Sequence, residues 1–330
     1  MSEAFSNQAM SEPLQQLCRL AAALRQAVQR VIIGQEQVVE EALIALLAGG
    51  HILIEGVPGL GKTLLVETLA KTISGDYQRI QFTPDLLPAD ITGSMVYDPS
   101  DGRFKLRRGP IFTHLLLADE INRAPAKTQA ALLEVMQERQ VTIEGKTLPL
   151  APPFMVLATQ NSFEQEGTYH LPEAQLDRFL LNSRIDYPSQ AAEQALLERL
   201  LSWKQPLANN TDAAQAILAA ADLPKWQQLL LEVVVDQRIV RYVLALVRKT
   251  REMEQFAVGA GPRAGIALLV AARARAILHQ RGYVLPEDIK ALAPAVLRHR
   301  LQRSPEAEID GLTSDDLIAQ LLQRVPLPRE

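Results

Sequence analysis

The residues best suited to chemistry form a glycine-rich stretch from Gly56 to Thr63, with the sequence GVPGLGKT, directly after the apolar run Ile52–Ile54. The stretch fits the pattern G-x-x-x-x-G-K-[ST], and an apolar run before it predicts a strand that feeds a loop and a helix. In such a loop backbone N–H groups surround a β-phosphate, Lys62 reaches the β and γ oxygens, and the Thr63 hydroxyl binds Mg²⁺. We therefore predict a nucleoside triphosphate site here. A chance glycine turn is the alternative.

A second stretch, Leu115–Glu120, places two carboxylates after four apolar residues. Because parallel sheets carry ligand chemistry at the carboxyl ends of their strands, both carboxylates are expected beside the glycine loop. Asp119 is placed to hold Mg²⁺ directly or through water, and Glu120 to polarise the water that attacks a γ-phosphate. A plain strand end would look the same in isolation, but the glycine loop upstream favours a function.

Three further polar residues stand where they could serve this chemistry. Asn161 follows the apolar run Phe154–Ala158, and its amide could orient the attacking water or merely cap a strand. Arg178 follows this strand without an obvious local partner, although a salt bridge to Asp177 or another acid is possible. Arg263 lies in the first turn of a predicted helix, where a cation opposes the helix dipole and suggests another use.

These residues need a sheet and helices to position them. Hydrophobic periodicity predicts helices over residues 12–31 and 128–138, and over Glu36–Leu47 and Lys62–Ser74. Short apolar runs predict the strands, which are Ile52–Ile54, Arg79–Phe82, Leu115–Glu120, Phe154–Ala158 and Leu181–Ile185.

The segment Pro84–Thr113 is too long for a plain connection between two strands, so it is expected to contain inserted secondary structure. Residues 94–97 and 103–106 flank an Asp-Gly turn, so a hairpin of about residues 94–108 is predicted, with Phe104 near its tip. It is either a contact element or a solvated loop with one aromatic residue. A second hairpin is predicted at about residues 140–150, around Glu144-Gly145.

Tyr187-Pro188 ends the sheet pattern, and everything after it is predicted to be helical. We place a domain boundary there, giving an α/β nucleotide domain over residues 1–187 and a helical lid over residues 188–330. The expected lid helices are Ala191–Leu201, Thr211–Ala221, Leu229–Arg251 with a possible interruption near Val235-Asp236, Pro262–Gln280, Pro286–Leu301 and Ile309–Val325.

Composition limits the class of protein. With 48% hydrophobic and 22% charged residues, the 330-residue chain is typical of soluble globular proteins. It lacks an apolar run of the roughly 18 residues that a bilayer span needs and its start is polar, so we expect a cytoplasmic protein. The single cysteine, Cys18, excludes an internal disulfide, and no Cys or His cluster suggests zinc.

The charge is unevenly distributed. A net charge of −4 argues weakly against a dedicated nucleic-acid binder. Residues 238–303 hold 13 Lys/Arg and 4 Asp/Glu, a local +9, so the remainder carries −13. This asymmetry suits head-to-tail self-association as well as an acidic partner.

From about Val28 to about Pro326 the sequence resembles MoxR-type AAA+ ATPases, which are related to the magnesium-chelatase ATPase subunit. Gly56–Thr63 matches Walker A and Leu115–Glu120 matches Walker B. Asn161 falls at sensor 1, Arg178 in Leu-Asp-Arg-Phe at the arginine finger, and Arg263 in Gly-Pro-Arg-Ala at sensor 2. Ile33-Gly34-Gln35 matches the segment that lines the adenine, and the two hairpins resemble those of this clade.

The resemblance implies an αβα P-loop domain with a five-stranded parallel sheet, a C-terminal all-helical lid, and a ring that is usually hexameric. It implies ATP and Mg²⁺ as cofactors, and catalytic roles for Glu120, Asn161, Arg178 and Arg263, with Arg178 acting on a neighbouring subunit and Arg263 acting in either its own or a neighbouring one. Thr63 and Asp119 are the expected metal ligands. The expected nucleotide-binding residues are Ile33, Gly34, Gln35, Gly56, Val57, Pro58, Gly59, Leu60, Gly61, Lys62, Thr63, Leu64 and Asp119.

The resemblance also implies a function, an ATP-driven remodeller of a protein client that works with a von Willebrand A-domain partner. A nucleic-acid-stimulated motor is the alternative, because four cations cluster in the inserted hairpin: Arg103, Lys105, Arg107 and Arg108. Overall acidity disfavours it, and four charges are few for binding a phosphate backbone. A nucleotide switch that rarely hydrolyses is weaker still, because Glu120 stands at the catalytic position.

Overall fold

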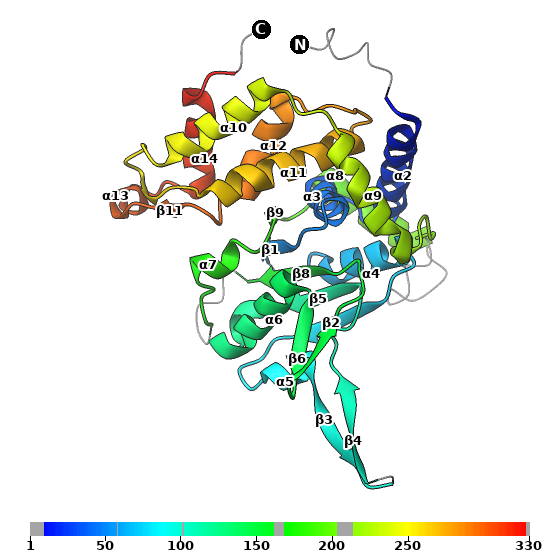
Figure 1. The fold of residues 1–330 in the computed structure, drawn as a ribbon. Helices are drawn as coiled ribbons and strands as arrows, with labels where there is room; N and C mark the ends of the chain where they lie inside the picture. The colour runs from blue at the N-terminus through cyan, green and yellow to red at the C-terminus, as the bar shows by residue number, and fades with distance from the viewer. Residues whose placement is uncertain (1–9, 58, 101, 162–167, 203–213, 328–330) are drawn as a thin grey trace.

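The structure is a computed structural model that describes residues 10–57, 59–100, 102–161, 168–202 and 214–327 (Figure 1). Its centre is a five-stranded sheet in the order β2-β5-β8-β1-β9, and every neighbouring pair is parallel. The strands are β1 (Ile52–Gly56), β2 (Tyr77–Gln81), β5 (Leu115–Asp119), β8 (Met155–Gln160) and β9 (Leu181–Ile185). The predicted fold class, a five-stranded parallel αβα sheet followed by a helical region, is confirmed.

Both faces of the sheet are covered, as expected for parallel strands. Side chains alternate between two apolar clusters. Leu53, Leu116 and Val156 pack on one face with α6 (Ala126–Glu138). The intervening residues face the helices α2 (Glu12–Gln29), α3 (Glu36–Leu47) and α4 (Lys62–Thr72). Shorter pieces are α5 (Pro88–Thr92), η1 (Ile121–Arg123) and α7 (Glu173–Leu176).

Both predicted hairpins are present. The first consists of β3 (Gly93–Asp98) and β4 (Arg103–Arg108) and projects from the body of the molecule (Figure 1). Near its tip the rings of Tyr97 and Phe104 meet edge to face at 5.4 Å, and both are more than half exposed. The second consists of β6 (Gln140–Ile143) and β7 (Lys146–Pro149) and packs near α6.

The C-terminal part is mainly helical, with a small two-stranded sheet that the sequence pattern did not predict. The helices are α8 (Gln190–Ser202), η3 (Ala220–Asp222), α9 (Leu223–Leu229), η4 (Leu230–Glu232), α10 (Gln237–Thr250), α11 (Pro262–Leu278), α12 (Pro286–Leu297), α13 (Pro305–Ile309) and α14 (Ser314–Arg324). The sheet pairs β10 (Phe256–Val258) with β11 (Gln302–Arg303).

The helix predicted over Thr211–Ala221 is wrong for its described part, residues 214–219. Residues 211–213 lie outside the described residues. The N–H groups of Ile217 and Leu218 donate to the Thr72 carbonyl at 2.7 and 3.2 Å, at the end of α4. This segment therefore pairs with a carbonyl at the C-terminal end of α4, where the helix itself supplies no partner, and does not form a helix.

Two other helix predictions need correction. The helix predicted from Leu229 begins only at Gln237, because Asp236 caps it by accepting the Arg238 N–H at 2.7 Å. The terminal helix predicted from Ile309 is divided into α13 and α14 by Gly311, whose φ of 71° ends the first helix. The predicted interruption near Val235-Asp236 is the true start of α10.

One apolar cluster joins α2, α3 and the sheet to α11, α12 and α14. Ion pairs reinforce this junction, because Glu40 on α3 contacts Arg25, Arg275 and His279. The boundary at residue 187 stays a prediction. None of the helices in the described ranges has the length and apolar character needed to cross a bilayer.

Candidate active site

A pocket of about 390 Å³ opens at the carboxyl edge of the sheet. It brings together most of the residues to which the sequence assigned nucleotide chemistry. The lining residues are Gly56, Gly59, Gly61, Lys62, Thr63, Leu64, Arg79, Gln81, Asp119, Glu120, Thr159 and Asn161. Pro58, also predicted to bind nucleotide, lies outside the described residues.

The glycine loop needs its glycines for two reasons. Gly59 and Gly61 have φ of 83° and 81°, and a Cβ at either would meet nothing within 4 Å, so their backbone faces open space. At Gly56 a Cβ would lie 2.2 Å from the Ile185 carbonyl oxygen, because β9 runs alongside. Leu60 packs on the core and Val57 is half-buried, so these two support the loop from outside the pocket.

Lys62 points back across the loop, where its Nζ donates to the Gly56 carbonyl at 2.8 Å. Burial lowers the pKa of Lys62, while the carboxylates of Asp119, Glu120 and Glu55 act in the opposite direction. An anionic phosphate in the pocket would favour the charged ammonium further.

Thr159 on β8 contacts the Asp119 carboxylate and the Glu120 backbone. Its hydroxyl donates to Asp119 Oδ1 at 2.6 Å and accepts the Glu120 N–H at 2.9 Å. Glu120 has a left-handed backbone, with φ of 56°, which is costly for a residue other than glycine and typical of functional sites. This conformation turns the chain out of the strand directly after Asp119.

Three residues that the sequence analysis did not single out bind one oxygen of each carboxylate. Arg79 on the edge strand β2 donates to Asp119 Oδ2 at 2.7 Å and to Gln81 Oε1 at 3.2 Å. Gln81 in turn donates to Glu120 Oε2 at 2.7 Å, and Arg123 donates to the same oxygen at 3.1 Å. The i, i+2 spacing at the end of a strand beside Leu115–Glu120 is the signal that would have found Arg79 and Gln81.

The predicted adenine segment, Ile33-Gly34-Gln35, reaches the same edge of the sheet. Gln35 donates to the Asp186 carbonyl at 2.9 Å, directly after the β9 residue Ile185 that pairs with Gly56. Gly34 has φ of 74°, and a Cβ there would lie 2.6 Å from that of Ala192 at the start of α8.

The oxygen donors in the pocket fit Mg²⁺. Thr63 offers a hydroxyl and Asp119 a carboxylate, which are ligands that Mg²⁺ prefers. Within the described ranges no group of three or more His, Cys, Asp or Glu could hold a metal by itself. This donor set suits an ion that takes its other ligands from phosphates and water.

Arg178 and Arg263 lie elsewhere, around a second pocket of about 300 Å³ that also contains Gly50, His51 and Arg300. Gly50 and His51 immediately precede β1, and the Leu180 N–H donates to the His51 carbonyl at 2.8 Å. Arg178 and Arg263 therefore lie at the amino edge of the sheet, opposite the glycine loop. The five residues of β1 separate the two edges by about 16 Å, at roughly 3.3 Å per residue.

Arg178 has a local partner after all, since its Nη1 donates to the Leu133 carbonyl on α6. Asp177, the alternative partner considered for it, is bound by Arg300 Nε at 2.7 Å and approached by Arg263 Nη1 at 3.4 Å. Arg263 is 66% exposed.

Arg300 is a buried anchor that the sequence did not reveal. Its guanidinium also donates to the carbonyls of Phe179 at 2.7 Å and Leu180 at 3.2 Å. Burial lowers the pKa of Arg300, and the hydrogen bond to Asp177 opposes this effect. Arg300 thus ties the turn that carries Arg178 to the end of α12.

Comparison with known proteins identifies the family. Residues 51–181 match the family described as "ATPase family associated with various cellular activities (AAA)", and residues 248–321 match the AAA lid domain. The chain is 45% identical to Chaperone MoxR1 of Mycobacterium tuberculosis, over 92% of this chain and 81% of that protein. The chain belongs to the MoxR family of AAA ATPases.

Other relatives agree with this assignment. Protein MoxR of Methylorubrum extorquens is 30% identical over 93% of this chain and 95% of its own length. The uncharacterized protein YeaC of Bacillus subtilis is 45% identical, with 91% and 92% covered. The crystal structure of a proposed ATPase from Cytophaga hutchinsonii superposes with a TM-score of 0.87 at 40% identity and covers both chains fully.

Membership of the MoxR family makes the protein an ATPase, and the pocket at the carboxyl edge contains the groups that this chemistry needs. Lys62, glycines of the loop and Glu120 line this pocket together, and Gln81 holds the Glu120 carboxylate by a hydrogen bond. The two arginines at the amino edge have no place in this pocket.

Proposed function

We propose that this MoxR-family protein hydrolyses ATP with Mg²⁺ at composite sites, each formed by the glycine loop of one subunit and the arginines of its neighbour. The observation that carries the proposal is the separation of Arg178 and Arg263 from the glycine loop by the length of β1. In this structure both arginines lie at the opposite edge of the sheet from the pocket of their own subunit. A ring of six subunits, the number usual in the family, would bring them to the next pocket.

In this proposal Lys62 and the loop bind the phosphates, and Thr63 and Asp119 would hold Mg²⁺. When bound, Mg²⁺ supplies neutralisation of phosphate charge. Glu120 accepts the proton of the attacking water, and Asn161, which also lines the pocket, orients that water. Ile33 to Gln35 contact the adenine.

Arg178 and Arg263 would act in trans on the charge that develops at the γ-phosphate. Arginine fingers contribute about 10³ to 10⁵ in rate in other systems. Arg178 must leave its bond to Leu133, and the exposed Arg263 can swing from Asp177, to which it lies at 3.4 Å.

The biological role that we propose is remodelling of a protein client, as in maturation, cofactor or metal insertion, or complex assembly, together with a von Willebrand A-domain partner in the cytoplasm. The name of the relative Chaperone MoxR1 supports a chaperone-like role. The projecting hairpin with its exposed Tyr97 and Phe104 is a suitable contact for a client.

The composite site predicts that the ATPase rate per subunit rises with protein concentration through the range in which subunits assemble. Steady-state phosphate release measured across that range, with assembly followed by light scattering, tests this. A rate per subunit that stays flat would contradict the shared site. Stimulation by DNA that vanishes at high salt would instead favour the nucleic-acid-stimulated motor.

A further inference from the structure

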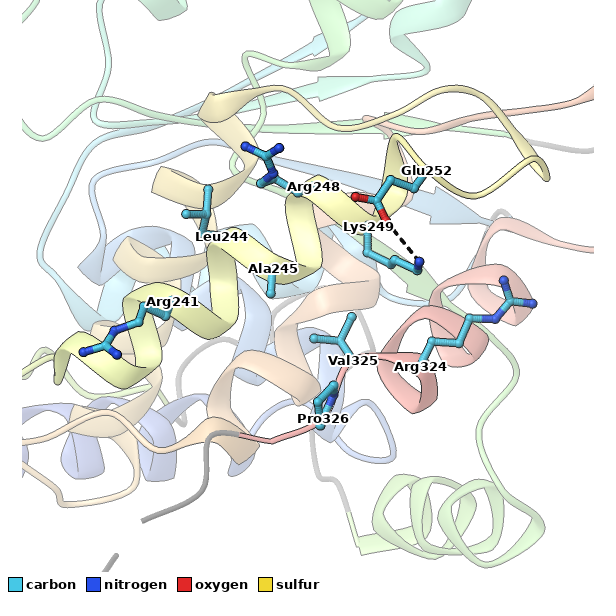
Figure 2. A pocket seen from close by; sticks show the side chains of 9 residues that line it. All are labelled: Arg241, Leu244, Ala245, Arg248, Lys249, Glu252, Arg324, Val325 and Pro326. Carbon is cyan, nitrogen blue, oxygen red and sulfur yellow. Dashed lines mark hydrogen bonds and ion pairs between the residues drawn. The ribbon is translucent and has the colours of Figure 1, made fainter.

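The lid carries a basic groove that has no part in the nucleotide chemistry. It has a volume of about 470 Å³ and lies between α10 and the end of α14, on the side of α11 that faces away from the sheet (Figure 1). Figure 2 shows its walls, which are Arg241, Leu244, Ala245, Arg248, Lys249, Glu252, Arg324, Val325 and Pro326. None of these residues lines the pocket at either edge of the sheet.

The helix α10 has two contrasting faces. Ile239, Tyr242, Val243, Leu246 and Val247 are buried in the lid. Arg241, Leu244 and Arg248 recur at intervals of three and four residues on the other face, so they form one stripe along the helix. Leu244 is 56% exposed in the middle of this stripe.

Most cations of the groove form no ion pair with a neighbouring acidic residue in the described part of the chain. Over its length α10 carries four basic residues and no acidic one. Lys249 pairs with Glu252 at 3.0 Å (Figure 2), which leaves the groove with the charges of three arginines. Among the described residues, no hydrogen bond or ion pair engages the guanidinium of Arg248 or Arg324.

Hydrogen bonds from Arg238 lower the pKa of Asp236, and the charge of Arg241 makes only a minor contribution. That carboxylate is bound by Arg238 through both oxygens, at 3.1 and 3.0 Å. A carboxylate from outside would therefore find Arg241, Arg248 and Arg324 available around an apolar floor of Leu244, Ala245, Val325 and Pro326.

We propose that this groove binds an acidic segment of a partner protein, with carboxylates paired to Arg241, Arg248 and Arg324 and an apolar side chain against Leu244. Charge complementarity carries the choice of partner, because guanidinium groups bind carboxylates in fixed bidentate geometry. A nucleic acid fits less well, since the groove presents no aromatic ring on which a base could stack. This inference goes beyond the proposed function and does not depend on it.

The test uses fluorescence anisotropy of a fluorescein-labelled peptide in which leucine recurs every third or fourth position among glutamates. The full-length protein should bind this peptide at low salt. Arg241→Glu/Arg248→Glu should weaken binding at least tenfold, and Leu244→Ser should weaken it severalfold. Lys225→Glu, which reverses one charge at an exposed position on α9 outside the groove, is the control and should leave the affinity unchanged.

Two peptide variants sharpen the test. With serine in place of leucine the peptide should bind more weakly, and with lysine in place of glutamate it should bind only the Arg241→Glu/Arg248→Glu protein. Because the substituted residues are exposed and outside the nucleotide site, basal ATPase should be unchanged, which shows that the variants fold. Absence of binding by the unmodified protein, equal binding of the serine peptide, or insensitivity to the double substitution would each overturn the proposal. So would a single-stranded oligonucleotide that binds in place of the peptide.

Discussion

Replacing Arg300 by methionine tests how Arg178 and Arg263, which we propose act in trans, are positioned. Methionine keeps the buried stem but removes the guanidinium, which bonds to Asp177 and to the carbonyls of Phe179 and Leu180. The Arg300 side chain is 5% exposed and that of Asp177 is 26% exposed. Removing one partner of a fully buried pair costs about 3–5 kcal/mol. Because Asp177 is partly exposed and keeps its contact with Arg263 at 3.4 Å, the expected loss lies at the lower end of this range.

We therefore expect Arg300→Met to lower the free energy of unfolding by about 3 kcal/mol or more, measured by urea denaturation. Asp177→Asn/Arg300→Met should be no less stable than Arg300→Met, since a neutral amide no longer requires a cation. Under native conditions Arg300→Met should bind an ATP analogue normally but hydrolyse ATP more slowly, because the turn that carries Arg178 is released. A stability loss below about 1 kcal/mol, the range of a surface pair, would refute the anchor role.

Three further predictions follow from the nucleotide pocket and from the buried histidines. Glu120→Gln should retain binding of a fluorescent ATP analogue but lose turnover by at least about 100-fold; turnover within threefold of the unmodified protein would assign the base elsewhere. Arg79→Gln should lower the Mg²⁺ concentration needed for half-maximal analogue binding by up to about fivefold, because Arg79 no longer competes with Mg²⁺ for Asp119 and a half-exposed ion pair is worth about 0.3–1 kcal/mol. An unchanged or higher Mg²⁺ concentration at half-maximal binding would contradict this. Burial lowers the pKa of His51 to about 4, so below its unfolded value of 6.5 the unfolded chain binds a proton that the native ring resists. The free energy of unfolding should accordingly fall as pH drops from 6.5 toward 4, and less steeply in His51→Gln; equal slopes would exclude this contribution.

The sequence predicted the place of the pocket where the residues that line it are neighbours in the chain. Gly56–Thr63 follows a strand and Leu115–Glu120 ends one, so each stretch places polar groups at the end of a strand. Because β1 and β5 flank β8 in a parallel sheet, the two stretches meet at one edge. The sheet was predictable for the same reason, since its strands are short apolar runs.

Residues that act through distant partners were not predictable in this way. Arg79 meets Asp119 across 40 positions, and Arg300 meets Asp177 across 123. Nothing local distinguishes Arg300 from a surface arginine, and the i, i+2 spacing of Arg79 and Gln81 on their strand does not by itself identify Asp119 as the partner of Arg79. The described part of the helix predicted over Thr211–Ala221 was wrong for a similar reason. Its alanine-rich pattern gives no sign that the Thr72 carbonyl accepts the N–H groups of Ile217 and Leu218.

The central claim, that each active site is shared between subunits, is tested most directly by mixing two inactive variants. Lys62→Ala should abolish nucleotide binding, because the loop loses its cation for the β and γ phosphates. Arg178→Ala should bind ATP but hydrolyse it poorly. In mixed assemblies some interfaces pair the intact loop of an Arg178→Ala subunit with the intact arginine of a Lys62→Ala subunit.

We predict that the mixture regains ATPase activity that neither variant has alone, in proportion to the frequency of such interfaces. Assembly must be verified in the same samples, by native mass spectrometry of subunits distinguished by a tag. If mixed assemblies form and the activity stays at the level of the separate variants, Arg178 does not complete a neighbouring site, and the composite active site is wrong.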